Sequence, residues 1–204
     1  KILAKRIKTL LDQYGVPEFL NKRDAFLFKM YQAFGHHFDF IAIPIIKKRL
    51  RMDTSQVIIN EERPQLTKHL ATRFKEKIGQ NVNLLGEVVL GNEEADHRYH
   101  HYLEALESPD INYISVKISG IYAQTHALNY EESFPELVSR MSALYQKAID
   151  FPYTDEDGIK RSKFINLDME EYKDAHFTLR LFKAVLNLPQ FKNYSAGIVV
   201  QAYL

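Results

Sequence analysis

The sequence contains no cysteine. Disulfides, thiolate metal sites and thiol catalysis are therefore excluded, and the chain suits a reducing cytosol. An excess of one charge is also lacking, because 27 lysines and arginines stand against 26 acids, for a net charge of +1. A balanced charge gives no global field that favours nucleic acid or an acidic membrane, so no nucleic-acid partner is expected.

Long apolar runs and a glycine-rich phosphate loop are missing as well. The longest apolar run, residues 40–46, is far shorter than the ~20 residues that a membrane-spanning helix needs. The chain opens on an amphipathic helical pattern rather than a signal peptide. Gly86, Gly91 and Gly120 lie near expected strand ends without the G-x-G-x-x-G spacing of a Rossmann site. We therefore expect a globular, cytoplasmic protein without a Rossmann dinucleotide site.

Helical periodicity dominates the N-terminal region. Pro44 predicts a break or kink in its third apolar stretch. The basic run at 47–51 could bind phosphate, although cations are also favourable at a solvated helix C-terminus. We expect residues 1–56 to form a helical N-terminal arm, followed by a separate domain at residues 57–204.

From residue 82 the pattern alternates between strand and helix. Strands are expected at 82–87, 112–119, 163–169 and 197–203. Helices are expected at 92–107, 133–150 and 174–187, the last with Asp174 as its N-cap, and a polar loop at 152–158. This alternation implies parallel strands joined by right-handed crossovers.

Each expected strand has one apolar face and one face that becomes polar toward its C-terminal end. A doubly wound sheet is covered on both faces and favours continuous apolar runs. A (β/α) barrel instead turns one face to its interior and carries its active site at the C-terminal strand ends. We therefore expect an α/β fold that forms the first half of a (β/α)₈, TIM-like barrel, with about four βα units. The polar residues at its mouth are Glu87, Lys117, Asp168 and Gln201.

Other interpretations of these residues remain open. His97 and His101 could present two imidazoles to a metal, but no glutamate follows the first histidine as in a zincin motif, so no metal site is expected. Lys117 could serve as a Schiff-base amine in another barrel enzyme, such as an aldolase. The polar strand ends could also be solvated loop boundaries, in a non-catalytic binding or regulatory module derived from a barrel.

Four stretches of the sequence resemble the proline dehydrogenase family, the FAD-dependent barrel enzymes of proline catabolism. They are VNLLGEVVLGNEEAD (82–96), YISVKIS (113–119), FINLDMEEYKD (164–174) and GIVVQAYL (197–204). Their order and spacing agree with the family. The residues of these stretches are most similar to those of the bifunctional forms, in which the barrel is fused to a second, aldehyde-oxidising dehydrogenase domain.

The resemblance implies a role for five residues. Lys117 resembles the lysine that pairs with the substrate carboxylate, and Asp168 resembles the aspartate that organises the substrate site beside the flavin. Gln201 resembles the glutamine that hydrogen-bonds the isoalloxazine, and Met169 lies where the family has a backbone contact to FAD. Glu87 resembles a glutamate that borders the site and pairs with a substrate-binding arginine.

The resemblance also implies an activity and its partners. The activity is FAD-dependent oxidation of L-proline to 1-pyrroline-5-carboxylate, with a quinone-type electron acceptor. The implied setting is the cytoplasm, at the inner membrane surface, with a C-terminal pyrroline-5-carboxylate dehydrogenase domain; a homo-oligomer stays open. A complete barrel needs eight strands and about 250 residues. We therefore expect this chain to be a fragment of the catalytic domain, truncated at the fourth strand and inactive in isolation.

Overall fold

The computed structural model divides into two compact units, Lys1–Leu66 and Thr67–Leu204. The first unit is helical, and the second contains a parallel sheet. No helix within the described ranges is long and apolar enough to cross a membrane. The residues that the structure describes are 2–34, 39–54, 58–59, 63–84, 91–123 and 129–202.

The first unit contains helices α1 (Ile2–Tyr14), α2 (Lys22–Phe34) and α3 (Asp39–Thr54). The α3 helix continues through Pro44, where the sequence predicts a break or kink. Pro44 lies in the second turn, so the missing N–H removes one bond of the helical ladder and leaves the rest in place. Arg49 in α3 forms an ion pair with Asp24 in α2, with 3.3 Å between Nη2 and Oδ2.

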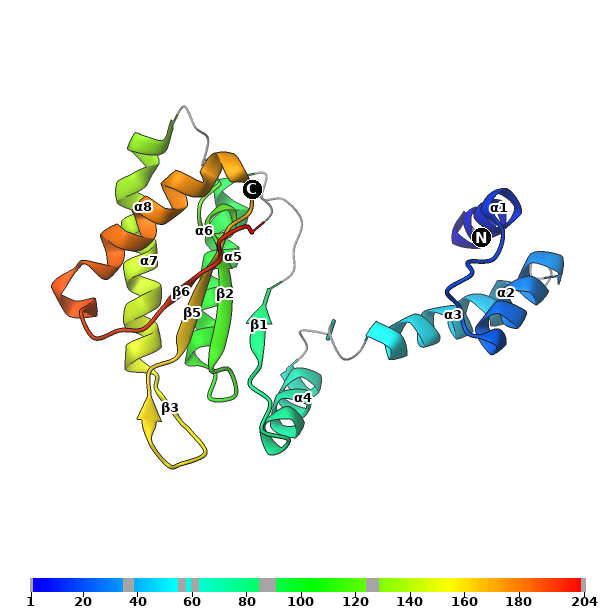
Figure 1. Ribbon diagram of the computed structural model, residues 1–204, viewed down its shortest axis with the longest axis horizontal. Helices are drawn as coiled ribbons and strands as arrows, with labels where there is room; N and C mark the ends of the chain where they lie inside the picture. Colours follow the sequence, from blue (N-terminus) through cyan, green and yellow to red (C-terminus); the bar gives the residue numbers. More distant parts are fainter. Residues whose placement is uncertain are drawn as a thin grey trace. The chain divides into compact units, whose positions relative to one another are not determined.

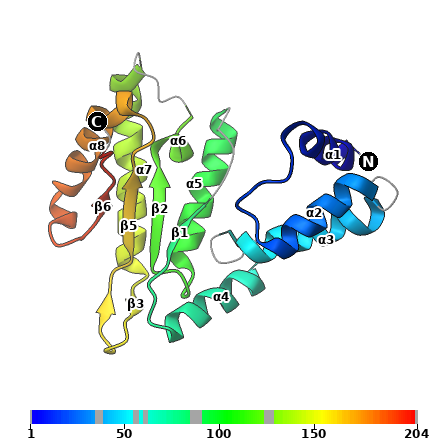
Figure 2. The same ribbon diagram turned by 45° about the vertical axis from the view of Figure 1, so that its right-hand side comes forward.

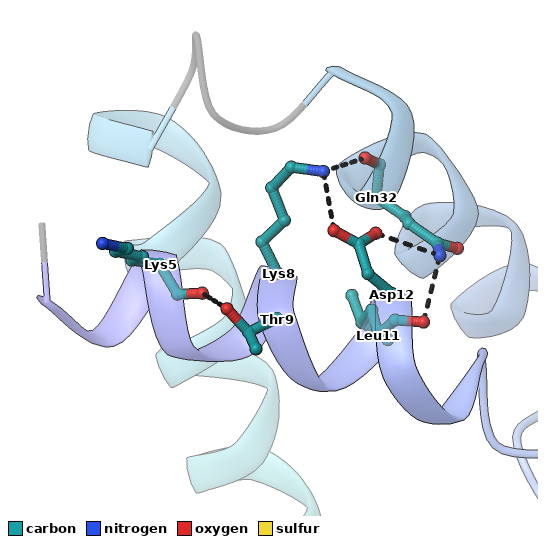
Figure 3. Close-up of polar contacts among 6 residues, drawn as sticks. All are labelled: Lys5, Lys8, Thr9, Leu11, Asp12 and Gln32. Carbon is teal, nitrogen blue, oxygen red and sulfur yellow. Dashed lines mark hydrogen bonds and ion pairs between the residues drawn. The ribbon is translucent and has the colours of Figure 1, made fainter.

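Polar contacts join α1 to α2 (Figure 3). The Lys8 ammonium lies 3.1 Å from Asp12 Oδ2 and donates to the carbonyl oxygen of Gln32 at 3.3 Å. The Gln32 side-chain amide in turn donates to the carbonyl oxygen of Leu11 at 3.0 Å. These contacts tie the two helices together beside the buried side chain of Leu11.

The second unit is built on four parallel strands in the order β1-β2-β5-β6. Because the strands follow one another in sequence order, right-handed crossovers place the connecting helices on one face of the sheet. Figures 1 and 2 show α5, α7 and α8 covering the same face. This arrangement confirms the expected fold class, the N-terminal part of a (β/α) barrel preceded by helices. The strands are β1 (Asn81–Asn83), β2 (Tyr113–Lys117), β5 (Phe164–Asp168) and β6 (Gly197–Ile198).

The helices of this unit lie close to the positions that the periodicity predicts. The predicted helix at 92–107 is α5 (Asn92–Glu107), and the predicted helix at 133–150 begins earlier, at Tyr130. Asp174 stands at the N-cap position of α8, but its carboxylate makes no capping bond and accepts a hydrogen bond from the Tyr130 hydroxyl instead. The helices are α5, the short α6 (Ile118–Ile121), α7 (Tyr130–Asp150) and α8 (Ala175–Leu186), preceded by α4 (Arg63–Lys75), which spans the boundary between the two units.

The core of this unit lies between the sheet and the helix layer. Ile114 and Val116 in β2, and Ile165 and Leu167 in β5, are fully buried, as the alternation predicts. Each such side chain contributes about 1.5–3 kcal/mol of transfer free energy when it leaves water. The opposite face of both strands is therefore left to point into the barrel interior.

The fourth strand is shorter than the alternation predicts. β6 covers Gly197–Ile198, whereas the alternation predicts a strand over 197–203, of which residue 203 lies outside the described residues. Val200 is 73% exposed instead of buried. Among the described residues β6 pairs with β5 alone, so nothing further extends its ladder. A strand at the edge of a sheet is paired along one side only, so its hydrogen-bonded ladder has less support than that of a central strand.

A two-stranded hairpin replaces the simple polar loop expected at 152–158. It consists of β3 (Tyr153–Thr154) and β4 (Lys160–Arg161) in antiparallel pairing. Asp155 organises the turn, because its Oδ1 accepts from the backbone N–H of Asp157 at 3.0 Å and of Ile159 at 2.9 Å. A hydrogen bond from Arg161, followed by that from Ile159, lowers the pKa of Asp155.

Candidate functional site

The strand register arranges the interior face of the sheet in rows. Lys117 pairs with Asp168 at the C-terminal ends of β2 and β5. One row deeper, the register continues across all four strands, and the residues at this level are Asn83, Ser115, Asn166 and Gly197. Partners in a parallel register share a face, so these side chains lie opposite the helix layer.

The Asp168 carboxylate is held by two amides. The side-chain Nδ2 of Asn166 donates to Asp168 Oδ1 at 2.8 Å, and Nδ2 of Asn83 lies 3.5 Å from Oδ2. The first is a well-formed hydrogen bond to an ionised acceptor, and the second is at the limit of the range. Asp168 is half-buried in this setting, so its carboxylate is both oriented and accessible from the mouth of the barrel.

Lys117 lies beside Asp168 with its ammonium only weakly engaged. Its Nζ is 3.9 Å from Glu170 Oε1, and the two side chains are 38% and 32% exposed. An ion pair of this length and exposure contributes about 0–1 kcal/mol. The ammonium therefore remains available to an incoming anion at the strand ends.

Glu170 contacts residues of two neighbouring strand ends, although it is not among the site residues predicted from the sequence. Its Oε2 accepts from the backbone N–H of Ser119 at 3.4 Å, and its carbonyl oxygen accepts from Gln201 Nε2 at 3.3 Å. Together with Lys117, these contacts connect the ends of three strands. The alternation of β5 offered the signal, because residue 170 continues the series of Asn166 and Asp168 on the interior face.

Gln201 lies one row farther out than Asp168. The register of Asn166 with Gly197 continues to place Gln201 level with Glu170 rather than with Asp168, because strands in a barrel are staggered. The Oε1 of Gln201 is buried and has no hydrogen-bond partner among the described residues. Buried acceptors are normally satisfied, so this oxygen marks a place for a donor from outside the described part of the chain.

Of the two remaining predicted site residues, Met169 and Glu87, the structure describes only the first. Met169 is the first residue after β5 and is half-buried between Asp168 and Glu170. Glu87 lies in 85–90, outside the described residues. The predicted site residues that the structure brings together are therefore Lys117, Asp168, Met169 and Gln201.

Tyr102 in α5 borders the site from the helix layer. Burial raises the pKa of Tyr102 to about 12, and the carboxylates of Asp168 and Glu170 act in the same direction. A Cβ placed on Gly120 would lie 3.1 Å from the Tyr102 hydroxyl oxygen, so the chain after β2 passes close to this ring. Tyr102 therefore remains a neutral phenol beneath the end of β2.

The histidine pair considered for a metal lies on α5. The rings of His97 and His101 have centroids 4.4 Å apart and are tilted by 51°. Among the residues with described positions, no group of three or more histidines, cysteines or acids is placed to hold a metal ion. The two rings therefore lie side by side on one face of α5.

Solved structures similar to this chain include two proline utilization A (PutA) proteins. PutA from Corynebacterium freiburgense is 31% identical, with a TM-score of 0.67, and the match covers 100% of this chain and 17% of that one. PutA from Bdellovibrio bacteriovorus, inactivated by N-propargylglycine, is 28% identical, with a TM-score of 0.66 and coverage of 81% and 18%. The chain thus spans less than a fifth of either protein. No match to a curated protein was found.

A further solved structure of 25% identity, with a TM-score of 0.51, is described as a bifunctional PutA protein. The family model described as proline dehydrogenase matches residues 66–204, which include the whole parallel sheet and its helix layer. The strand order, the helices on one face and this match agree with one another. The chain belongs to the proline dehydrogenase family.

Proposed function

We propose that this chain is part of a catalytic domain that oxidises L-proline to 1-pyrroline-5-carboxylate with FAD. Residues 57–204 supply the first half of the barrel in this proposal, and residues 1–56 an N-terminal helical arm. The observation that carries it is the pairing of Lys117 with Asp168 at the C-terminal end of the sheet. Active sites of (β/α) barrels lie at that end.

Lys117 is proposed to bind the substrate carboxylate. Its ammonium is a compact point charge on a flexible stem and is held only loosely by Glu170 at 3.9 Å. A substrate anion can therefore take its place next to Lys117 without breaking a strong ion pair. The neighbouring Asp168 carries the opposite charge at the same level of the barrel. The pair offers one charge of each sign to an incoming zwitterionic amino acid, whose ammonium must lose a proton before the hydride can leave.

Gln201 and Met169 are proposed to hold the flavin. The buried Oε1 of Gln201, which has no hydrogen-bond partner in the described part of the chain, suits a ring N–H donor such as the isoalloxazine possesses. The Nε2 of the same side chain donates to the Glu170 carbonyl oxygen. The backbone of Met169 follows Asp168 at the same rim of the barrel and is available for a polar contact. FAD, when bound, supplies the electron-accepting chemistry.

The chain's own residues bind and orient the substrate. Forming the C=N bond of the product from a neutral amine removes a hydride from carbon, which FAD would accept when bound, and a proton from nitrogen, which solvent would accept. The amine must therefore be neutral, and its carbon must face the hydride acceptor. Lys117 fixes the carboxylate end of the substrate, and Asp168 holds a negative charge in place beside the flavin. Glu87 is proposed to pair with a substrate-binding arginine from another part of the protein.

The setting of the reaction is part of the same proposal. In this proposal electrons pass onward to a quinone-type acceptor, and the protein works in the cytoplasm at the inner membrane surface. A pyrroline-5-carboxylate dehydrogenase domain after the barrel would consume the product. The likeness to PutA proteins, one of which is described as bifunctional, supports the second domain.

The test uses the complete protein that contains this chain. We expect a yellow protein with the visible absorption of a flavin and proline-dependent reduction of an artificial electron-accepting dye. Loss of dye reduction in the Lys117→Ala variant, with flavin retained, would place the lysine on the substrate rather than on the cofactor. A colourless protein without turnover would contradict the proposal and favour the non-catalytic module.

A further inference from the structure

Gly197 in β6 leaves room for a side chain of the neighbouring strand. A Cβ built on Gly197 would lie 2.5 Å from Asn166 Oδ1 and 3.0 Å from Cε1 and Cζ of Phe164. Real Cβ atoms essentially never approach another heavy atom to 2.5 Å, so any other residue here would displace the Asn166 amide. Gly197 does not need its conformational freedom, because its φ is not positive. Its contribution is the missing Cβ.

The other end of the same amide reaches Asp168. While Oδ1 of Asn166 lies over Gly197, its Nδ2 donates to Asp168 Oδ1 at 2.8 Å. Asn166 and Asp168 are two residues apart in β5 and therefore share the interior face. The amide is thus limited on one side by the strand β6 and bonded on the other to the carboxylate.

We propose that Asn166 is a positioning residue for Asp168 and that Gly197 provides the space that lets the Asn166 amide take this position. The inference rests on the proposed function, in which Asp168 organises the substrate site. In this role Asn166 acts through its hydrogen bond to Asp168. A displaced amide would release the Asp168 carboxylate to rotate away from its productive orientation.

The composition of the barrel interior supports a role beyond packing. Interior layers of (β/α) barrels are usually filled by bulky branched side chains, whereas here the row of Asn83, Ser115, Asn166 and Gly197 is polar or bare. A partly buried amide costs free energy unless it is hydrogen-bonded. The Asn166 side chain donates its hydrogen bond to Asp168. The need to hold this carboxylate therefore explains why an amide stands in this row.

The first experiment compares three single variants of the complete flavoprotein. Asn166→Ala removes the donor, and Gly197→Ala pushes the amide away while leaving Asn166 present. We expect both to lower kcat/KM for proline about 10-fold to 100-fold, as for the loss of a hydrogen bond to a charged group. Gly79→Ala is the matched control, because a Cβ at Gly79 meets no atom within 4 Å. It should leave kcat/KM unchanged.

The double variant separates positioning from general damage. With Asn166 truncated to alanine, the methyl group at position 197 no longer displaces an amide, and the end of the Phe164 ring can shift. The Asn166→Ala/Gly197→Ala variant should therefore be no less active than Asn166→Ala alone, since coupled sites are not additive. Additive losses, or losses that follow flavin content and thermal midpoint alone, would overturn the inference.

A readout independent of turnover tests the contact itself. In the wild-type protein the side-chain amide protons of Asn166 should exchange slowly with solvent and give a distinct NMR signal. Asp168→Ala should accelerate that exchange and shift the signal, while Gly79→Ala should not. An unchanged Asn166 signal in Asp168→Ala would overturn the inference even if the protein oxidises proline. A wild-type protein without proline turnover would contradict the proposed function, whatever the amide shows.

Discussion

Lys117 and Asp168 are register partners on neighbouring parallel strands, so a cation and an anion end β2 and β5 at the same level. Their surroundings differ. Two amides hold Asp168, at 2.8 and 3.5 Å, whereas Lys117 has a carboxylate of Glu170 at 3.9 Å. The anion is therefore fixed and the cation is free to move. This asymmetry suits a site in which Lys117 receives a carboxylate and Asp168 provides a fixed reference point.

The first prediction concerns the Lys117 ammonium. In the complete flavoprotein, Lys117→Ala should raise KM for proline about 10-fold to 100-fold, because a charged hydrogen bond to the substrate carboxylate is lost. Lys117→Arg should restore binding only in part, since a planar fork does not replace a point charge. Steady-state kinetics measure both effects. Lys183→Ala, at an exposed position of α8, is the matched control. An unchanged KM in Lys117→Ala would remove Lys117 from the substrate site.

The second prediction concerns the buried oxygen of Gln201. Gln201→Leu keeps the approximate size of the side chain and removes both the acceptor and the donor to Glu170. We expect FAD to bind about 3-fold to 10-fold more weakly, which corresponds to one neutral hydrogen bond. Titration of the flavin-free protein with FAD measures the change. Gln190→Leu, at an exposed position, should leave FAD binding as it is. Equal affinities in all three proteins would show that Oε1 faces something other than the flavin.

The sequence predicts the helices and strands that are determined by the spacing of apolar residues within each segment. The bounds of α5 (Asn92–Glu107) follow from its apolar periodicity, and the buried faces of β2 and β5 follow from their alternation. The expectation of a barrel rather than a doubly wound sheet followed from the polar face of each strand. These features depend on neighbours a few residues apart, which a single sequence displays.

The contacts that complete the site could not be predicted in the same way. The space above Gly197 for the Asn166 amide depends on the register of two strands that are separated in sequence by a helix. The position of Gln201, level with Glu170, depends on the stagger of β6 against β5. Register and stagger are properties of the assembled sheet, so a pattern within one strand does not determine them.

The third prediction concerns the stability of the helix layer. Arg140 in α7 lies 2.6 Å from Asp96 and 2.7 Å from Glu136, and donates to the carbonyl oxygen of Ile121 at 2.9 Å. Its side chain is 17% exposed. Arg140→Ala should lower the free energy of unfolding by about 2–3 kcal/mol, because charged hydrogen bonds to α5 and α6 are lost together.

Chemical denaturation of the two proteins measures this difference. Arg180→Ala is the control, since Arg180 also pairs with an acid, Glu131, but at 50% exposure. An exposed ion pair contributes about 0–1 kcal/mol, so the control should change little. A loss in Arg140→Ala as small as about 0–1 kcal/mol, the range of an exposed ion pair, would show that Arg140 does not link the helices as its contacts indicate.

The last prediction is a pH dependence of stability that originates at Lys163. This side chain is 1% exposed at the start of β5, where its ammonium donates to the carbonyl oxygen of Ser108. Burial lowers the pKa of Lys163 from 10.5 to about 8, while the charge of Asp110 acts in the opposite direction. The unfolded chain therefore binds more protons than the folded chain between pH 8 and 10.5. Stability should rise with pH across this window, because the slope follows the excess of protons in the unfolded state.

Lys163→Met isolates that contribution. The variant keeps an apolar stem of similar length but carries no titratable group, so the rise in its unfolding free energy from pH 8 to 10 should be smaller than in the wild type. The difference should be on the order of 1–3 kcal/mol over the full window. Tyrosines that titrate above this range are common to both proteins and cancel in the comparison. Denaturation at a series of pH values provides the measurement, and parallel pH profiles would mean that the Lys163 ammonium remains charged and solvated in the folded protein.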